Sequence, residues 1–431
     1  MARLLIHGGT VINPATGLQK NLDVLVEGER VVALGSALSV PDALRVEATG
    51  CYVVPGLLDM HVHLRDPGFP DKETLKTGTQ AAAAGGITRV VLMPNTRPVV
   101  DNLETLATVL DTAHRDGVVW VHTTAALTQG LAGLERTDMA GLAKAGAVAF
   151  TDDGKTVMDP VLLYEIFQTA AKLDVLIASH CEDHHLVQGG AMHRGEVSRL
   201  LGDVGIPALG EELVIARDLL FAADTGARLH IQHVSTARGV QLIREAKARG
   251  VRVTAEATPH HFSLTDAAVW TYGALAKVNP PLRPEADRVA VVAGLQDGTL
   301  DAIATDHAPH TLAEKRQGLT QAPFGFVGLE TSVGLAFTHL VHTGKLSADQ
   351  VIAKMTVAPA QILALPIPQL AVGAAADITV IDPDFEWTVD PGRFFSKAGH
   401  SPFAGAHLRG KAVATVVGGR LVYSEREGLR T

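Results

Sequence analysis

Residues 53–63 read Val53-Val54-Pro55-Gly56-Leu57-Leu58-Asp59-Met60-His61-Val62-His63. The stretch begins as an apolar run of strand-like length and ends in two histidines with one residue between them. Alternate side chains of a β-strand lie on the same face, so this spacing predicts that His61 and His63 bind one metal ion together. A single His-x-His pair also arises by chance, so the prediction depends on further ligands downstream.

The composition indicates a globular protein that acts on a small molecule. Of 431 residues, 47% are hydrophobic and 19% are charged, and no uncharged apolar run is long enough to span a membrane. The formal net charge is −9 and no run of Lys and Arg offers a track for phosphates, which argues against nucleic acid as a partner. The first residues reach Gly8 too soon to contain the apolar core of a signal peptide, and two cysteines are too few for a disulfide framework. We therefore expect a cytoplasmic protein.

The middle of the chain alternates between strand-like and helical segments. After the stretch at 53–63, seven apolar runs are strand candidates, at 89–93, 118–122, 147–150, 175–180, 228–233, 251–255 and 300–305. Helical segments are expected between and after them, at 72–84, 102–116, 159–173, 211–225, 237–249, 283–295, 329–343 and 348–365. Eight strand-helix units predict an α/β fold, a TIM (β/α)8 barrel of residues 54–365, with its active site at the C-terminal ends of the strands.

Both ends of the chain are rich in short strands instead. Strands are expected at 3–7, 23–27 and 30–34, and again at 377–382, 411–417 and 420–423, with Gly and Pro turns between them. Chain termini commonly lie close together in a folded domain. We therefore expect a small β-sandwich domain built from residues 1–53 and 366–431.

Side chains that bind metals occur at the ends of five predicted strands. The set is His61, His63, Asp153, His180, His233 and Asp306. In a barrel these strand ends meet at one mouth, although the residues are far apart in sequence. Four histidines and two carboxylates suit a pair of divalent first-row metal ions, and we expect zinc.

Longer segments around these residues carry a family resemblance. They are Asp-Met-His-Val-His-Leu-Arg-Asp-Pro-Gly at 59–68, Met-Pro-Asn-Thr-Arg-Pro at 93–98, Phe-Thr-Asp-Asp-Gly at 150–154 and Ala-Thr-Asp-His-Ala-Pro-His at 304–310, with further matches at 279–283 and 323–325. The chain resembles the amidohydrolase superfamily throughout and, within it, the bacterial type I dihydroorotases. This resemblance implies a zinc-dependent, reversible cyclisation of N-carbamoyl-L-aspartate to L-dihydroorotate in pyrimidine (UMP) biosynthesis.

Members of this superfamily differ in the residue at the end of the fourth predicted strand. Hydantoinases and allantoinases have a carbamylated lysine there that bridges two metals, whereas this chain has Asp152 and Asp153. The resemblance implies that Asp153 bridges two zinc ions together with a hydroxide, and strand alternation favours it over Asp152. Lys155 has the same parity as Asp153 and is the alternative bridging residue.

The chemistry of cyclic amides assigns roles to two further side chains. Opening such an amide requires a hydroxide, a polarised carbonyl and a proton for the leaving nitrogen, and zinc can supply the first two. Asp306 suits the third as a general acid and base, the alternative being a ligand only. Arg65 can lean towards the same mouth and bind a substrate carboxylate, the alternative being a surface ion pair with Asp66. The resemblance adds further substrate-binding residues, namely His63, Asn95, Asn279, His310, Phe324 and Gly325.

Other functions and partners follow from the same family. The enzymatic alternative is another cyclic-amide hydrolase, an allantoinase or hydantoinase. A different class is a non-catalytic dihydroorotase-like scaffold subunit, but such proteins typically lose ligands and this chain retains all six. We expect a homodimer and, by the resemblance, a possible complex with aspartate transcarbamoylase. The polar segment 311–322 is either a lid over the substrate or an ordinary exposed loop.

Overall fold

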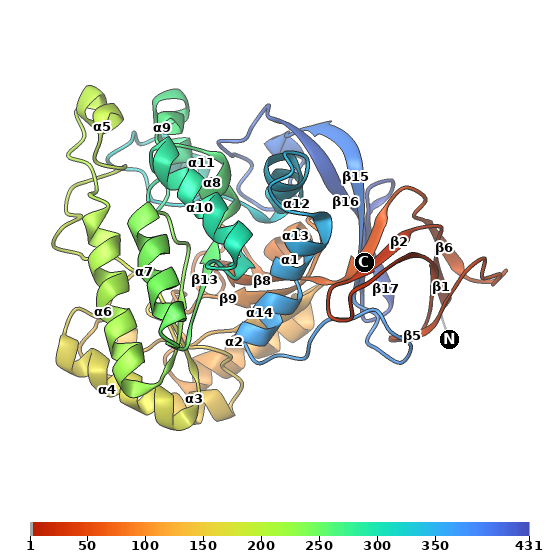
Figure 1. Cartoon of the computed structure of the whole chain (residues 1–431), viewed down its shortest axis with the longest axis horizontal. Helices are drawn as coiled ribbons and strands as arrows, with labels where there is room; N and C mark the ends of the chain where they lie inside the picture. The colour runs from red at the N-terminus through yellow and green to blue at the C-terminus, as the bar shows by residue number, and fades with distance from the viewer. Residues whose placement is uncertain (1–2, 431) are drawn as a thin grey trace.

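The computed structural model describes residues 3–430 and contains two groups of parallel strands at its centre (Figure 1). The first group pairs in the order β10-β9-β8 and the second in the order β11-β12-β13-β14. Their bounds are β8 Leu57–Val62, β9 Ile87–Leu92, β10 Trp120–Thr123, β11 Leu176–Ser179, β12 Arg228–Ile231, β13 Val253–Ala257 and β14 Ala302–Ile303. All pairings within the two groups are parallel, which is the arrangement that strands joined by helices adopt.

Isolated bridges join the two groups into a closed strand ring. Phe150 bridges Ala125 on one side and Ile177 on the other, and Val62 bridges His307 across the opposite gap. The predicted strand at 147–150 was therefore wrong as a full strand, although the segment occupies the fourth position of the ring. It is too short for a continuous ladder and contributes only main-chain hydrogen bonds such as the 2.9 Å bond from Phe150 N to Leu176 O.

Helices surround the strand ring (Figure 1). The longer ones are α1 Leu75–Ala84, α2 Leu103–Asp116, α4 Pro160–Leu173, α6 Leu209–Thr225, α7 Ala237–Ala248 and α10 Glu285–Asp297. The shorter ones are α3 Met139–Lys144, α5 Glu196–Leu201, α8 Pro259–Ser263, α9 Ala267–Tyr272, α11 Leu312–Lys315, α12 Ser332–Ala336, α13 Ala348–Lys354 and α14 Val357–Ile362. Side chains of Thr74, Asn102 and Asp159 accept main-chain N–H groups at the starts of α1, α2 and α4, as N-caps do.

The sequence overestimated the continuity of the last two predicted helices. The segment expected at 348–365 is divided between α13 and α14, because Thr356 has φ −136° and ψ −78°, outside the helical region. The segment expected at 329–343 consists of a 3-10 turn, α12 and a π-helical turn over Phe337–Val341. In residues 3–430, no helix combines the length and apolar character that a membrane crossing requires.

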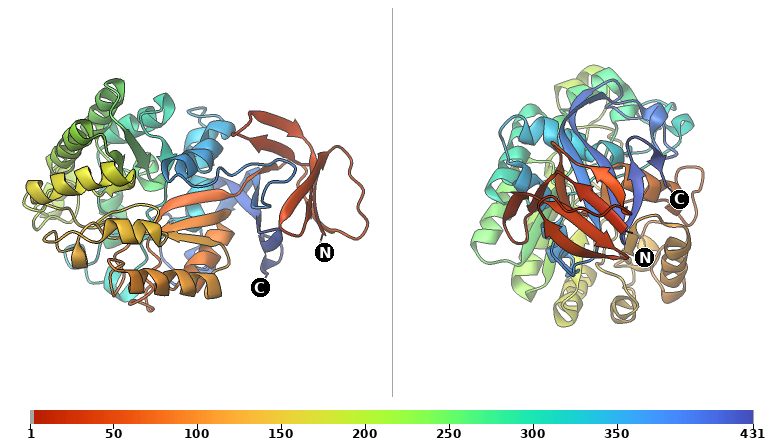
Figure 2. Two further views of the ribbon diagram at one scale, coloured as in Figure 1. Left: turned by 90° about the horizontal axis from the view of Figure 1, so that it is seen from below. Right: turned by 90° about the vertical axis from the view of Figure 1, so that its right-hand side faces the viewer.

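Two sheets of mostly antiparallel strands lie at the end of the molecule where both termini are found (Figure 2). One has the order β5-β4-β1-β6 and the other β18-β17-β16-β15-β7-β2-β3. Their bounds are β1 Arg3–His7, β2 Thr10–Asn13, β3 Leu18–Asn21, β4 Asp23–Glu27, β5 Arg30–Gly35, β6 Leu44–Glu47, β7 Tyr52–Pro55, β15 Ile378–Thr388, β16 His407–Val417, β17 Arg420–Ser424 and β18 Gly428–Leu429. Apolar side chains of both sheets, such as Ile6, Val24, Val53 and Val380, form one buried cluster.

The stretch at 53–63 joins these two parts of the molecule. It forms two strands rather than one: β7 belongs to the seven-stranded sheet and β8 to the strand ring, with Gly56 between them. A Cβ atom at Gly56 would lie 2.1 Å from Oγ1 of Thr88, so the junction between the two strands requires glycine. This junction leads the chain directly into the strand that ends in the two histidines.

The segment between β15 and β16 reaches from the terminal sheets to the mouth of the strand ring. His400 donates from Nε2 to the main-chain oxygen of His310 at 2.8 Å, and the Ser396 hydroxyl donates to Glu73. Glu73 also lies 3.4 Å from Nε2 of His307. The C-terminal part of the chain thus contacts the loop that follows the eighth strand.

Candidate active site

All six candidate ligands converge at the mouth of the strand ring, around the carboxylate of Asp153. Oδ1 of Asp153 lies 3.3 Å from Nε2 of His61, 3.8 Å from Nδ1 of His180 and 3.9 Å from Nε2 of His233. Its other oxygen lies 3.4 Å from Nε2 of His63. Strands β8, β11 and β12 direct the histidines inward because they run parallel and their C-terminal ends share one side of the ring.

Asp306 completes the cluster from the end of the eighth strand. Its Oδ1 lies 3.1 Å from Nε2 of His63 and 3.6 Å from Nε2 of His61. Among the described residues, two sets of side chains lie close enough together to hold a metal ion. One set is His61, Asp153 and His233, and the other is His61, His63 and Asp306. The shared His61 and the intervening Asp153 make this one composite cluster.

Buried polar atoms at the centre of the cluster have unused bonding capacity. Nε2 of His61 and Oδ1 of Asp153 are buried without a hydrogen-bond partner in the part of the chain that the structure describes. Leaving such atoms unsatisfied is costly, and a divalent cation would satisfy both. The donor set, imidazole nitrogens and carboxylate oxygens, is one that binds zinc and similar metals. The residues therefore fit a metal centre.

The electrostatics of the cluster favour a bound cation. Burial opposes ionisation of Asp153, but His61, His63 and His180 hold its pKa well below the usual range. Burial also acts against charge on His61, yet Glu256, Asp153 and Asp306 raise its pKa well above normal. The carboxylates thus create a field that draws positive charge to this point, whether a proton or a metal ion.

Three of the histidines are oriented by acceptors that point away from the centre. Nδ1 of His61 lies 2.6 Å from Oε1 of Glu256, and Nδ1 of His63 lies 2.9 Å from Oδ1 of Asn95. Nε2 of His180 lies 3.0 Å from Oε2 of Glu182. Because each outer nitrogen donates to its acceptor, the inner nitrogen of each ring is the one that would bind a metal ion.

Sequence reasoning missed Glu256 and Glu182. Glu256 is fully buried and lies in β13, within the run Val253-Thr254-Ala255-Glu256-Ala257. A lone carboxylate in an apolar strand is a signal for an internal partner, and it could have been recognised. Glu182 follows His180 by two residues and also accepts a hydrogen bond from the Asn279 amide, a contact that only the folded chain reveals.

The two rivals of Asp153 lie away from the histidines. Oδ1 of Asp152 accepts main-chain N–H groups of Leu127 and Thr128 at 2.8 and 3.0 Å, so Asp152 shapes the neighbouring loop. Lys155 is exposed and lies in the turn after Gly154. Asp153 is the residue of this segment that faces the cluster.

Arg65 and His310 form the wall beside the cluster. Arg65 donates from Nε to the main-chain oxygen of Pro309 at 3.2 Å, which aims its guanidinium group along the mouth. Burial lowers the pKa of Arg65 to about 10, so the group remains charged at neutral pH. His310 donates from Nε2 to the Phe324 carbonyl at 2.8 Å and accepts from Lys72 at 3.1 Å.

A cavity of about 220 Å³ opens onto this cluster. Its lining includes every sequence-predicted ligand and substrate-binding residue except His61, which lies beneath it. These lining residues are His63, Arg65, Asn95, Asp153, His180, His233, Asn279, Asp306, His310, Phe324 and Gly325. Such a cavity, small and rich in charged and polar groups, suits a small polar ligand.

The main chain is strained where it presents three of these residues. Arg65, His233 and Asp306 have φ of 58°, 33° and 50°, a region that side chains other than glycine seldom occupy. Strain of this kind persists only where surrounding structure enforces it, and it often marks functional sites. Here it turns three side chains into the same cavity.

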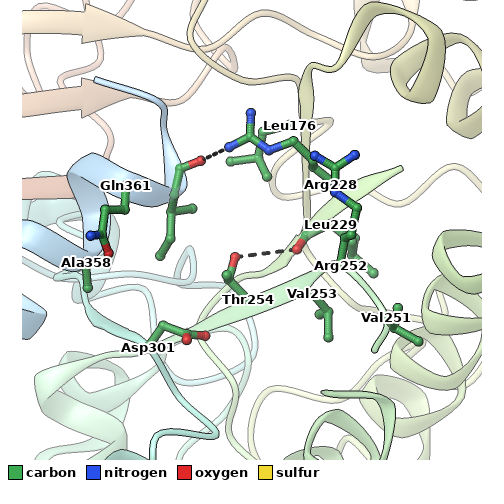
Figure 3. A pocket seen from close by; sticks show the side chains of 11 residues that line it. Leu176, Arg228, Leu229, Val251, Arg252, Val253, Thr254, Asp301, Ala358 and Gln361 are labelled. Atoms are coloured by element: carbon green, nitrogen blue, oxygen red, sulfur yellow. Dashed lines mark hydrogen bonds between the residues drawn. The ribbon is translucent and has the colours of Figure 1, made fainter. Parts of the chain in front are cut away.

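A second cavity, of about 300 Å³, lies at the opposite end of the strand ring. Figure 3 shows the side chains that line it. It is lined by the N-terminal ends of strands, for example Leu176 and Val253, and by α14. Its charged groups already have partners: Arg228 donates to the Ile362 carbonyl, and Asp301 pairs with Lys247 at 2.6 Å. This end of such a ring usually serves stability and not catalysis.

Comparisons with known proteins agree with this architecture. The solved structure of L-hydantoinase (dihydropyrimidinase) from Arthrobacter aurescens is 27% identical, has a TM-score of 0.90 and covers 100% of this chain and 98% of its own. The fold and the site define a cyclic amidohydrolase, a class of metalloenzymes. The family model described as dihydro-orotase-like matches residues 50–239.

Sequence relatives specify the family. Dihydroorotase of Pelotomaculum thermopropionicum is 52% identical over 98% of this chain and 99% of the relative. Dihydroorotase of Halalkalibacterium halodurans is 46% identical over 99% of this chain and 100% of the relative. The chain belongs to the dihydroorotase family.

Proposed function

We propose that this enzyme interconverts N-carbamoyl-L-aspartate and L-dihydroorotate in pyrimidine biosynthesis. The observation that carries the proposal is that one small cavity contains both the His and Asp cluster and the half-buried cation of Arg65. Dihydroorotate bears a carboxylate beside a cyclic amide, so its recognition requires a cation next to the hydrolytic centre. The similarity to proteins named dihydroorotase over almost the full chain supports the same substrate.

We further propose that the cluster holds two zinc ions, which His61, His63, Asp153, His180, His233 and Asp306 would bind. Zinc bound there would activate water and polarise the scissile carbonyl. Asp306 lines the cavity with its Oδ1 facing His63, and it takes a proton from the attacking water and returns it to the leaving nitrogen. The carboxylate of the substrate pairs with Arg65, and Asn95, Asn279 and His310 border the same space.

We extend the proposal to the division of the chain into domains. We assign the strand ring and its helices to a TIM (β/α)8 barrel of residues 56–365 and the terminal sheets to a composite β domain of residues 3–55 and 366–430, because β7 ends at Pro55 within the seven-stranded sheet. The cytoplasmic location, the homodimer and a complex with aspartate transcarbamoylase stay predictions.

A substrate panel tests the proposed reaction. The zinc-loaded protein would be assayed with L-dihydroorotate, a 5-substituted hydantoin, dihydrouracil and allantoin, with Asp306→Asn as the control for contaminating activity. We expect hydrolysis of dihydroorotate to exceed that of the other substrates at least 100-fold, and Asp306→Asn to lose about 100- to 10,000-fold in rate. Preferential hydrolysis of hydantoin or allantoin would identify the protein as another cyclic-amide hydrolase, and no hydrolysis of any of them would favour the scaffold.

A further inference from the structure

The loop after the eighth strand folds around a buried ammonium group. Lys315, the last residue of α11, is 2% exposed. Its Nζ donates to the main-chain oxygens of Gly325, Pro323 and Lys277 at 2.8, 3.0 and 3.2 Å. All three acceptors are neutral carbonyl groups, and they use the three N–H donors of the ammonium.

These three carbonyl groups belong to two segments that border the substrate cavity. Gly325 lines the cavity itself, and Pro323 precedes Phe324, another lining residue. Lys277 lies two residues before Asn279, on the loop after the seventh strand, and its carbonyl also accepts the N–H of Gly325 at 2.9 Å. The ammonium therefore fastens the loop after the eighth strand to the loop after the seventh.

A second lysine secures the other half of the same loop. Lys277 donates from Nζ to the main-chain oxygens of Leu319 and Thr320 at 2.8 and 3.1 Å. The same Nζ lies 4.3 Å from the centre of the Phe324 ring, a cation–π distance. Together the two lysines fix the main chain on both sides of Phe324.

An ammonium is a costly means of holding a loop together. Burial, assisted by the nearby charge of Lys277, lowers the pKa of Lys315 to about 7, which shows how strongly this environment disfavours the charge. A well-packed apolar side chain would avoid that cost but could not bind three carbonyl oxygens. What the ammonium uniquely supplies is a fixed position for those carbonyl groups and for the cavity wall attached to them.

We propose that Lys315 is a positioning residue for the substrate, which holds the Phe324–Gly325 wall of the cavity against the Lys277–Asn279 segment. The inference rests on the proposed function and deepens it. Because Lys315 lies behind the wall and does not line the cavity, its loss should weaken substrate binding without removing a reacting group. The result would be a raised KM with little change in kcat or zinc content.

The test uses the full-length, zinc-loaded protein with Lys315→Ala and Lys315→Met, and Arg316→Ala as the matched control. Arg316 is the next residue and is exposed. We expect both Lys315 variants to raise the KM for dihydroorotate at least tenfold, with kcat within about threefold of wild type and unchanged zinc content. Arg316→Ala should keep the wild-type KM.

Chemical rescue distinguishes the effect of the ammonium group from the effect of the volume that the side chain fills. Propylammonium, which matches the atoms removed in Lys315→Ala, should lower the raised KM severalfold, whereas 1-propanol should not. If Lys315→Ala does not fold, the KM of Lys315→Met decides alone. A wild-type KM in the variant that folds, or equal rescue by 1-propanol, would overturn the inference. Failure of the wild-type protein to hydrolyse dihydroorotate would instead refute the proposed function.

Discussion

Oε1 of Glu256 lies 2.6 Å from Nδ1 of His61, deep beneath the cluster of candidate ligands. The other oxygen of the same carboxylate lies 3.1 Å from Nε2 of His230, whose Nδ1 is 2.9 Å from the hydroxyl of Thr254. Glu256 therefore accepts from Nδ1 of His61 and orients the ring so that Nε2 faces Asp153. A carboxylate behind a metal-binding histidine fixes its tautomer and increases its basicity.

Glu256→Gln should lower metal affinity without removing a ligand. The glutamine keeps the size of the side chain but loses the charge that orients and polarises His61, so we expect zinc affinity to fall about 10- to 100-fold. Competition with a chromophoric chelator would measure it. Glu330→Gln is the control, because Glu330 is a half-buried carboxylate that accepts main-chain N–H groups of Phe395 and Ser396. Equal zinc affinities in the two variants would contradict this role.

Metal stoichiometry distinguishes the two candidate bridging residues. Asp153 faces all four histidines whereas Lys155 is exposed, so Asp153→Asn should lose at least one zinc ion per chain and Lys155→Ala should lose none. Elemental analysis of the dialysed proteins provides the measurement. Retention of two zinc ions by Asp153→Asn, or their loss from Lys155→Ala, would transfer the bridging role to Lys155.

The candidate ligands could be predicted because they follow a rule of the fold. The C-terminal ends of parallel strands meet at one mouth, so a histidine or aspartate at a strand end can be assigned to the site from sequence alone. Glu256 could not be assigned by this rule, because it lies within its strand and contacts His61 beneath the cluster. The break between β7 and β8 at Gly56 could not be predicted either, because it depends on the close approach of Thr88, a residue of a neighbouring strand. The role of Lys315 could not be predicted, because its acceptors are main-chain oxygens, which the sequence does not distinguish from any others.

Arg65→Met should weaken substrate binding while leaving the metal centre intact. Arg65 contacts Pro309 and lines the cavity, but its guanidinium group is not one of the candidate ligands. Loss of a charge-assisted hydrogen bond is worth about 1.5–3 kcal/mol, which corresponds to a rise in KM of roughly 10- to 100-fold. Steady-state kinetics and zinc analysis on the same preparation would test both parts. A wild-type KM would show that the substrate carboxylate binds elsewhere.

The product ratio of the proposed reaction should depend on pH. Cyclisation converts a dianion with two carboxylates into a monoanion, releases water and consumes one proton. Between about pH 6 and 8 both carboxylates of the open form are ionised, so each unit of falling pH should shift the ratio about tenfold towards dihydroorotate. Chromatography of mixtures brought to equilibrium from either direction measures the ratio. A ratio independent of pH would exclude this reaction.

Removing one partner of the buried pair of Glu211 and Arg283 should lower stability more than replacing both partners with apolar residues. Nη2 of Arg283 lies 3.1 Å from Oε2 of Glu211, both side chains are almost fully buried, and Glu211 also accepts the N–H of Ser235 at 2.8 Å. Glu211→Leu leaves an unpaired buried cation, so we expect a loss of about 3–5 kcal/mol in stability. The double variant Glu211→Leu/Arg283→Met removes both charges and should melt at a higher temperature than Glu211→Leu alone. Thermal melts of the metal-free proteins would measure the difference. If the stability losses caused by the two single substitutions simply add in the double variant, the two charges do not stabilise each other.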